Sequence, residues 1–131
     1  MIRVTLTIGI FTSCIIFHSI LYAQADVDII AEEGVYAKCI GCHSPAYHRT
    51  GPKHCGLLGR KAGSETGFTY TAALKNSGIV WTTETLNLFL MAPLKMVPGT
   101  NMGFSGISSS VERSQLIRYL SRLNEDNPLC N

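Results

Sequence analysis

The chain has 131 residues, 46% of them hydrophobic and 15% charged, with five cysteines and a formal charge of +2. This length suits a single domain and excludes a dinucleotide-binding fold with a second lobe. The small net charge argues against a strongly basic surface that would bind nucleic acid or an anionic membrane. The apolar content argues against disorder.

The first segment, residues 1–25, is predicted to be a secretory signal peptide. Arg3 supplies a positive start, an apolar stretch follows from Val4 to Leu21, and Ala23-Gln24-Ala25 forms an A-x-A cleavage site. Polar residues interrupt the stretch, so it would span a bilayer poorly as a retained anchor, which is the alternative. We therefore expect an exported, periplasmic or otherwise extracytoplasmic domain over residues 26–131.

A helix is predicted from about Val27 into the motif Cys39-Ile40-Gly41-Cys42-His43. A C-x-x-C motif in an exported chain is compatible with a redox dithiol, half of a metal site, or covalent haem attachment. The following His43 favours haem c, because two thioethers and one imidazole can then reach the same macrocycle. No second ligand pair with zinc-site spacing follows in the sequence, and mostly helical patterning leaves no βαβ unit for a thioredoxin-like site.

The remaining pattern is helical and shows no strand-like alternation. Two further histidines, His48 and His54, lie in a polar loop and are interpreted as solvated. A short helix is predicted from about residue 83 to residue 91, stopped by a following proline. A last helix is predicted after Ser109, because Ser109 and Glu112 form the S-x-x-E pattern of a capping box.

A haem electron carrier commonly uses methionine as its second axial ligand. Met91 ends an apolar run and is interpreted as a core residue, whereas Met96 lies in a short loop between prolines. Met102 lies in a segment that starts at Pro98 and is rich in glycine, so no regular element can form there. Such a loop can lay one side chain over a haem face, and Met102 is the favoured ligand.

Taken together, these motifs resemble those of class I cytochromes c of the mitochondrial and short soluble bacterial type. The resemblance runs from Cys39 to about Leu123 and rests on the shared order of several segments, namely residues 39–43, 50–52, 56–63, 67–71, 79–81 and 98–104. It implies an all-α fold with helices packed around one covalently bound haem c. It also implies that the first and last helices cross near Tyr36 and Tyr119.

The resemblance implies roles for ten residues. Cys39 and Cys42 attach the haem, and His43 and Met102 ligate its iron. The Pro52 carbonyl accepts the Nδ1–H of His43 and so fixes its tautomer. Haem propionates need paired or hydrogen-bonded partners, and Phe104 shields the haem edge. The residues implied in these remaining haem contacts are Arg60, Tyr70, Trp81, Thr100 and Phe104.

The implied function is a monomeric electron carrier that is not an enzyme. It passes single electrons between redox partner proteins, with donor and acceptor complexes expected to be membrane-bound, and it takes no nucleic acid and no small-molecule substrate. Two alternatives remain open at this point. One is a haem subunit permanently docked on a dehydrogenase or oxidase, and the other is a small peroxidase-like enzyme with Met102 detached from the iron.

Two departures from the family pattern matter. The mitochondrial proteins carry a ring of docking lysines, whereas only Lys38, Lys61 and Lys95 are candidates here, so we hypothesise a largely apolar partner interface. Cys55 and Cys130 have no implied haem role. In an oxidising compartment they can form a disulfide or remain as two free thiols, and the sequence leaves both outcomes open.

Overall fold

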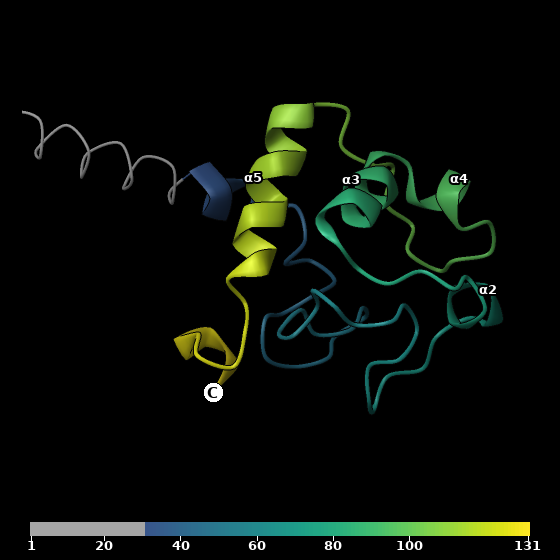
Figure 1. Ribbon diagram of the computed structural model, residues 1–131, viewed down its shortest axis with the longest axis horizontal. Helices are drawn as coiled ribbons and strands as arrows, with labels where there is room; N and C mark the ends of the chain where they lie inside the picture. The colour runs from purple at the N-terminus through teal and green to yellow at the C-terminus, as the bar shows by residue number, and fades with distance from the viewer. Residues whose placement is uncertain (1–30) are drawn as a thin grey trace, which may run out of the picture.

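The computed structural model describes residues 31–131, so the predicted signal peptide and the start of the first helix lie outside the described residues. Residues 31–36 are helical. Five short elements follow along the chain (Figure 1): α2 Ala72–Lys75, α3 Thr83–Met91, α4 Pro93–Met96, α5 Ser110–Ser121 and the 3₁₀ helix η1 Pro128–Cys130.

No strand is formed within residues 31–131, where the β pairing consists of one isolated antiparallel bridge between Lys61 and Val80. This agrees with the predicted all-α class. None of the helices in this range is long and apolar enough to cross a bilayer. Because the helices are short and no strand is formed in this range, long loops account for much of the described chain. These loops are held by turns and side-chain contacts.

The helix α3 has the predicted bounds because both of its ends are locally encoded. Thr82 caps its start: the Thr82 hydroxyl accepts from the Thr85 backbone at 3.2 Å, and Thr85 Oγ1 accepts from the Thr82 backbone at 2.8 Å. At the other end Pro93 begins the separate turn α4, and a proline is tolerated at a helix start because its missing N–H has no intrahelical partner there.

The helix α5 also starts as predicted. The Ser109 hydroxyl accepts from the Glu112 backbone N–H at 3.3 Å, which satisfies one of the unpaired donors at the helix N-terminus. Its inward face is apolar, since Leu116 is 0% exposed and Leu120 is 3% exposed. This face packs against α3, which places both helices around a common interior.

The first helical segment lies beside α5, as the blue and yellow-green ribbons in Figure 1 show. The rings of Tyr36 and Tyr119 are 4.3 Å apart, so the expected aromatic contact between the terminal helices is confirmed. Glu32, which is only 3% exposed, adds a polar clamp. Its carboxylate pairs with Arg118 at 2.8 Å and with Arg122, both at the end of α5 or just after it.

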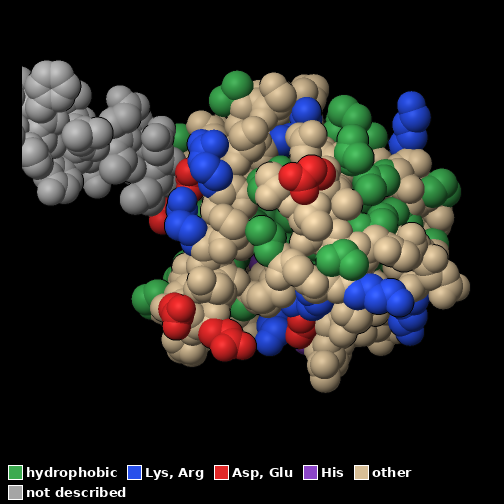
Figure 2. All heavy atoms as spheres, in the orientation of Figure 1, with side chains coloured by type: hydrophobic (Ala, Val, Ile, Leu, Met, Phe, Trp, Pro, Cys, Tyr) green, Lys and Arg blue, Asp and Glu red, His purple; other side chains and the backbone are tan. Residues whose placement is uncertain are grey.

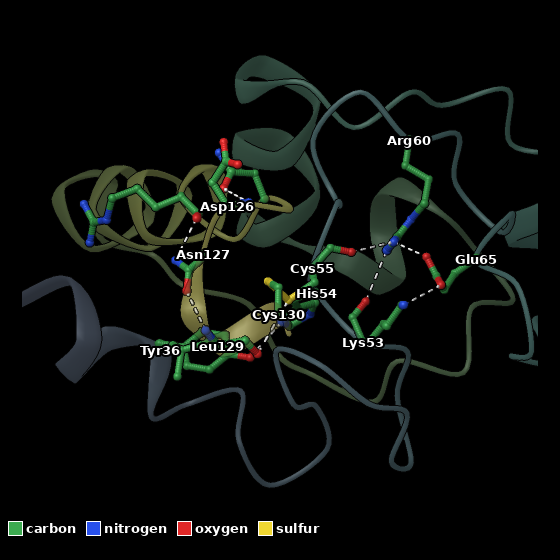
Figure 3. Close-up of a disulfide and its surroundings, with 12 residues drawn as sticks. Tyr36, Lys53, His54, Cys55, Arg60, Glu65, Asp126, Asn127, Leu129 and Cys130 are labelled. Carbon is green, nitrogen blue, oxygen red and sulfur yellow. Dashed lines mark hydrogen bonds and ion pairs between the residues drawn. A yellow bond between two sulfur atoms is a disulfide. The ribbon is translucent and has the colours of Figure 1, made fainter.

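The C-terminal tail is tied to the middle of the chain by a disulfide between Cys55 and Cys130, whose Cα atoms are 5.7 Å apart (Figure 3). A backbone hydrogen bond from Gly56 N–H to the Leu123 carbonyl, 2.7 Å long, joins the same two segments. Of the two outcomes left open by the sequence, the structure has the disulfide. It fixes the loop that follows Pro52, which borders the site described next.

Candidate functional site

The interior between α3, α5 and the long loops holds a cavity of about 410 Å³. This volume lies in the usual range for cofactor sites, roughly 300–1,000 Å³. Leu86, Phe89 and Leu90 of α3 and Leu116 and Leu120 of α5 form apolar walls. The cavity brings together all ten residues singled out from the sequence, which are Cys39, Cys42, His43, Pro52, Arg60, Tyr70, Trp81, Thr100, Met102 and Phe104.

The C-x-x-C-H motif forms a tight turn at one edge of the cavity. The Cys39 carbonyl accepts from the backbone N–H groups of both Cys42 and His43, at 3.0 and 2.9 Å. Cys39 is half-buried and Cys42 is exposed, and neither of them is in a disulfide. The turn therefore presents two sulfurs and an imidazole to the same space.

His43 is held in one tautomer. Its Nδ1 donates to the Pro52 carbonyl at 2.7 Å, so the proton lies on Nδ1 and the lone pair lies on Nε2. The ring is 8% exposed. Burial lowers the pKa of His43, and the hydrogen bond to Pro52 opposes this in part, which leaves a neutral imidazole with a nitrogen available as a ligand.

Gly51 is required for the close approach of the backbone to this imidazole. A Cβ at Gly51 would lie 2.3 Å from His43 Cε1 and 2.6 Å from both ring nitrogens. The Gly51 N–H also donates to the Cys42 carbonyl at 2.7 Å, which closes the loop onto the motif. Any larger residue at position 51 would therefore push the His43 ring out of place.

Met102 lies at the cavity on an irregular loop, as expected. Its backbone N–H donates to Thr100 Oγ1 at 3.3 Å, and Gly99 makes the preceding turn with φ = 92°, which favours glycine. Met96 does not line the cavity. The interpretation of Met91 as a core residue is wrong, since it is 48% exposed: the inward positions of α3 are taken by its two preceding neighbours.

Arg60 lies at the cavity and is held by three partners (Figure 3). Its guanidinium donates to the backbone carbonyls of Cys55 at 3.1 Å and Lys53 at 3.2 Å, and it forms an ion pair with Glu65. The Glu65 side chain is 11% exposed, and Lys53 Nζ lies 3.6 Å from its second oxygen. Glu65 could not be predicted as part of the site, because a single glutamate in a polar loop carries no distinguishing pattern.

The other predicted contacts are aromatic residues buried at the cavity wall. Tyr70 is 9% exposed, and burial is the main reason that its pKa is raised. Trp81 is 7% exposed, and its ring centroid lies 4.9 Å from that of Phe89 of α3. Phe104 is half-buried at the Met102 loop. These rings give the cavity a mainly apolar lining with a few polar atoms.

The interpretation of His54 as a solvated residue is wrong. His54 is 9% exposed, and its ring is stacked on that of His43 with the centroids 4.2 Å apart. Burial, followed by the nearby His43 and Arg60, lowers the pKa of His54 to about 3. The loop turns inward because the His54 N–H donates to the Ser44 and Pro45 carbonyls and because the next residue is in the disulfide.

His48 is also engaged rather than solvated. Its Nε2 hydrogen-bonds to the Thr66 carbonyl at 2.9 Å, and its Nδ1 accepts from the Lys53 backbone at 3.1 Å. Both ring nitrogens therefore hold loops together. No sequence pattern distinguishes His48 from His54, because the difference depends on which loop turns toward the cavity.

The donor set fits a haem better than a bare metal ion. Among residues 31–131, no group of three or more His, Cys, Asp or Glu side chains could hold an ion by itself. The cavity instead offers Nε2 of His43, the thioether of Met102 and the sulfurs of Cys39 and Cys42 within apolar walls. Such a set leaves the other ligand positions of an iron to a macrocycle, as in haem c.

Comparisons with known proteins point the same way. The chain is 45% identical over 85 residues to cytochrome c 2.1 of Caenorhabditis elegans, covering 63% of this chain and 77% of that one. It is 39% identical over 102 residues to cytochrome c2 of Blastochloris viridis, covering 76% and 80% of the two chains. Among solved structures, cytochrome cH from Methylobacterium extorquens matches with a TM-score of 0.69 and 39% identity, over 70% of this chain and 95% of that one.

No family model matches the chain. The alignments nevertheless cover 77–95% of these relatives' own length at 39–45% identity, and the solved structure shares the fold. The chain therefore belongs to the class I cytochromes c, which carry one covalently attached haem c and are electron-transfer proteins rather than enzymes.

Proposed function

We propose that this protein is a monohaem electron carrier with histidine and methionine as axial ligands. In this proposal Cys39 and Cys42 hold the haem through thioether bonds, and His43 and Met102 ligate its iron. The observation that carries the proposal is the convergence of these four side chains on one apolar cavity. The bound group supplies an iron centre that gains or loses one electron.

The task of His43 is to offer one nitrogen in a fixed orientation. Since Nδ1 donates to the Pro52 carbonyl at 2.7 Å, only Nε2 is available as a ligand, and the hydrogen bond increases its basicity. Gly51 keeps the backbone close to the ring without a steric clash. This arrangement supports His43 as the residue that would ligate the haem iron.

Met102 contributes a soft thioether, which favours the reduced iron and raises the potential. Its loop is held by the turn around Gly99 and by the hydrogen bond from Met102 N–H to Thr100. Phe104, two residues further on, excludes water at the cavity edge in this proposal. Exclusion of water disfavours the additional charge of the oxidised iron, so it acts in the same direction as the thioether.

Arg60, Tyr70 and Trp81 serve the haem carboxylates in this proposal. Arg60 uses three of its N–H groups on the Cys55 and Lys53 carbonyls and on Glu65. A guanidinium has about five N–H donors, so two remain for a haem carboxylate. The buried rings of Tyr70 and Trp81 each carry one further donor at the cavity, the Tyr70 hydroxyl and the Trp81 indole N–H.

Partner proteins dock on a largely apolar surface in this proposal, with little electrostatic steering. Exposed apolar side chains gather over α3 and α4 (Figure 2), where Leu88, Met91 and Leu94 are 51%, 48% and 52% exposed. Of the candidate docking lysines, Lys38 is already paired with Glu112 at 2.8 Å. The rate of electron transfer to a purified partner should therefore change little with ionic strength, and a steep fall with added salt would contradict this.

The same apolar surface favours one second candidate, a haem subunit that stays docked on a larger oxidoreductase. The two candidates differ in oligomeric state. A freely diffusing carrier elutes as a monomer from a sizing column, whereas a subunit leaves its host membrane or complex only under dissociating conditions.

We also propose that the protein is exported to the periplasm or otherwise out of the cytoplasm, with residues 1–25 removed. The positive start, the apolar stretch and the A-x-A site support this. Intact-mass measurement of the natively produced protein tests it, because cleavage after Ala25 leaves Asp26 as the first residue. A mass that includes residues 1–25 would instead indicate a retained anchor.

The ligand assignment is tested by optical spectra of both redox states, recorded with haem-loaded protein. Methionine ligation gives a weak absorption band near the red end of the visible spectrum in the oxidised state. Met102→Ala should abolish this band and lower the reduction potential, whereas the matched control Met91→Ala should leave both unchanged, since Met91 does not line the cavity. A band that survives in Met102→Ala would overturn the assignment of Met102.

A further inference from the structure

The His54 ring lies face to face on the imidazole of His43. The two ring centroids are 4.2 Å apart and the planes are 19° from parallel, which is a stacked arrangement. His54 also lines the cavity. No hydrogen bond joins the two rings among the described contacts, so the contact between them is one of surfaces. It restricts how far either ring can rotate.

His54 is itself held in place from several sides. Its Nδ1 hydrogen-bonds to the Tyr36 hydroxyl at 3.1 Å, and the Tyr36 ring meets it edge-on at 5.7 Å. Tyr36 is 4% exposed and packs against Tyr119 of α5. The backbone at His54 is fixed by the Ser44 and Pro45 carbonyls and by the adjoining disulfide. The stacking ring is therefore a rigid surface.

The backbone at Gly51 also closes on His43. A Cβ at Gly51 would have ring atoms of His43 as its three nearest neighbours, at 2.3 to 2.6 Å. Pro52 holds the ring edge through Nδ1. The imidazole is thus confined by the stacked His54 ring, by the Gly51 backbone and by the hydrogen bond at one nitrogen.

We propose that His54 is a positioning residue that fixes the rotation of the His43 imidazole about its Cβ–Cγ bond. The hydrogen bond to Pro52 alone permits the ring to tilt about the N–O direction, and the stacked ring removes this freedom. The inference rests on His43 being the axial ligand, as proposed above.

The test uses the haem-loaded oxidised protein and three variants. The shifts of the haem methyl resonances in paramagnetic NMR and the g-values in electron paramagnetic resonance both depend on the orientation of the axial imidazole. His54→Leu removes the flat surface and should change the order or spread of the methyl shifts. His54→Phe keeps a flat ring and should stay close to the unmodified protein. Tyr47→Leu, which removes a ring that is 63% exposed, should leave the spectra unchanged.

The proposal is overturned when His54→Leu gives the same methyl pattern and g-values as the unmodified protein, or when His54→Phe shifts as far as His54→Leu. If the His54 variants do not fold, Tyr36→Phe serves instead, because it removes one hydroxyl and keeps both rings. In Tyr36→Phe the haem methyl resonances should move measurably, but less than the loss of the stacked ring would move them. Unchanged methyl resonances in this variant would contradict the proposal. An unmodified protein without an axial-histidine spectrum would contradict the ligand assignment instead, so the two failures are distinguishable.

Discussion

Removal of the Cys55–Cys130 disulfide should lower the free energy of unfolding by several kcal/mol. The two cysteines are separated by 75 residues, and they close a loop that includes α2 to α5. The chain-entropy expression for a loop of this length gives about 4.5 kcal/mol at 25 °C. Measured effects of native disulfides are commonly about 2–5 kcal/mol. We therefore expect a loss of about 2–4.5 kcal/mol in the variant Cys55→Ser/Cys130→Ser.

The assay is unfolding in urea, followed by the optical signal of the haem and by circular dichroism. The double variant leaves no unpaired thiol, so it avoids mixed disulfides. Its unfolded chain is less constrained and exposes more surface, so the dependence of the free energy on urea should become steeper. As a control, a thiol reductant added to the unmodified protein should give the same loss, since it cleaves disulfides and leaves thioethers intact.

Two results would refute this reasoning. A double variant within about 1 kcal/mol of the unmodified protein would mean that the crosslink contributes far less than loop closure predicts. A large loss of unfolding free energy with an unchanged dependence of that free energy on urea would also refute it. The disulfide would then act in the folded state, where it holds the loop of His54 against the cavity. Non-reducing mass spectrometry must also find both thiols oxidised in the unmodified protein.

Two further predictions concern the cavity. Glu65→Gln removes the carboxylate paired with Arg60, so stability should fall by roughly 1.5–3 kcal/mol, and the reduction potential should rise because less negative charge opposes the added electron. Redox titration beside the exposed control Glu125→Gln measures this, and a lowered potential would contradict it. Gly51→Ala places a Cβ 2.3 Å from His43 Cε1 and should cost about 1–3 kcal/mol and change the spectrum of the axial histidine. Urea unfolding and optical spectra check this, and an unchanged spectrum would show that the backbone shifts without moving the ring.

Helix bounds were predictable where the signals are local. The end of α3 follows from Pro93, and the start of α5 follows from Ser109, because both depend on residues within one turn of the helix. It was less predictable whether a residue at a helix end faces the interior or the solvent. Met91 faces solvent because α3 turns its two preceding residues inward, and that rotation is set by packing against α5.

The positions of the charged and histidine side chains in the loops could not be predicted. Glu65 and His54 carry no periodicity, and polar loop residues are usually exposed. His54 is buried against Tyr36, 18 residues earlier in the chain, and Glu65 is buried against Arg60, whose guanidinium is brought to the cavity by the folding of the loops. Fixing these side chains costs conformational entropy, and only the contacts of the folded protein offset that cost.

The sequence by itself determined the chemistry of this protein. The C-x-x-C-H motif, the loop of Met102 and the order of the motifs are covalent or local features, so they could be read without coordinates, and all ten expected site residues lie at one cavity. The tertiary structure alone decided that Cys55 pairs with Cys130 and that His54 stacks on His43. The reason is physical: a disulfide or a ring stack depends on distances of a few ångströms between groups, and only the packing of the terminal helices and loops sets those distances.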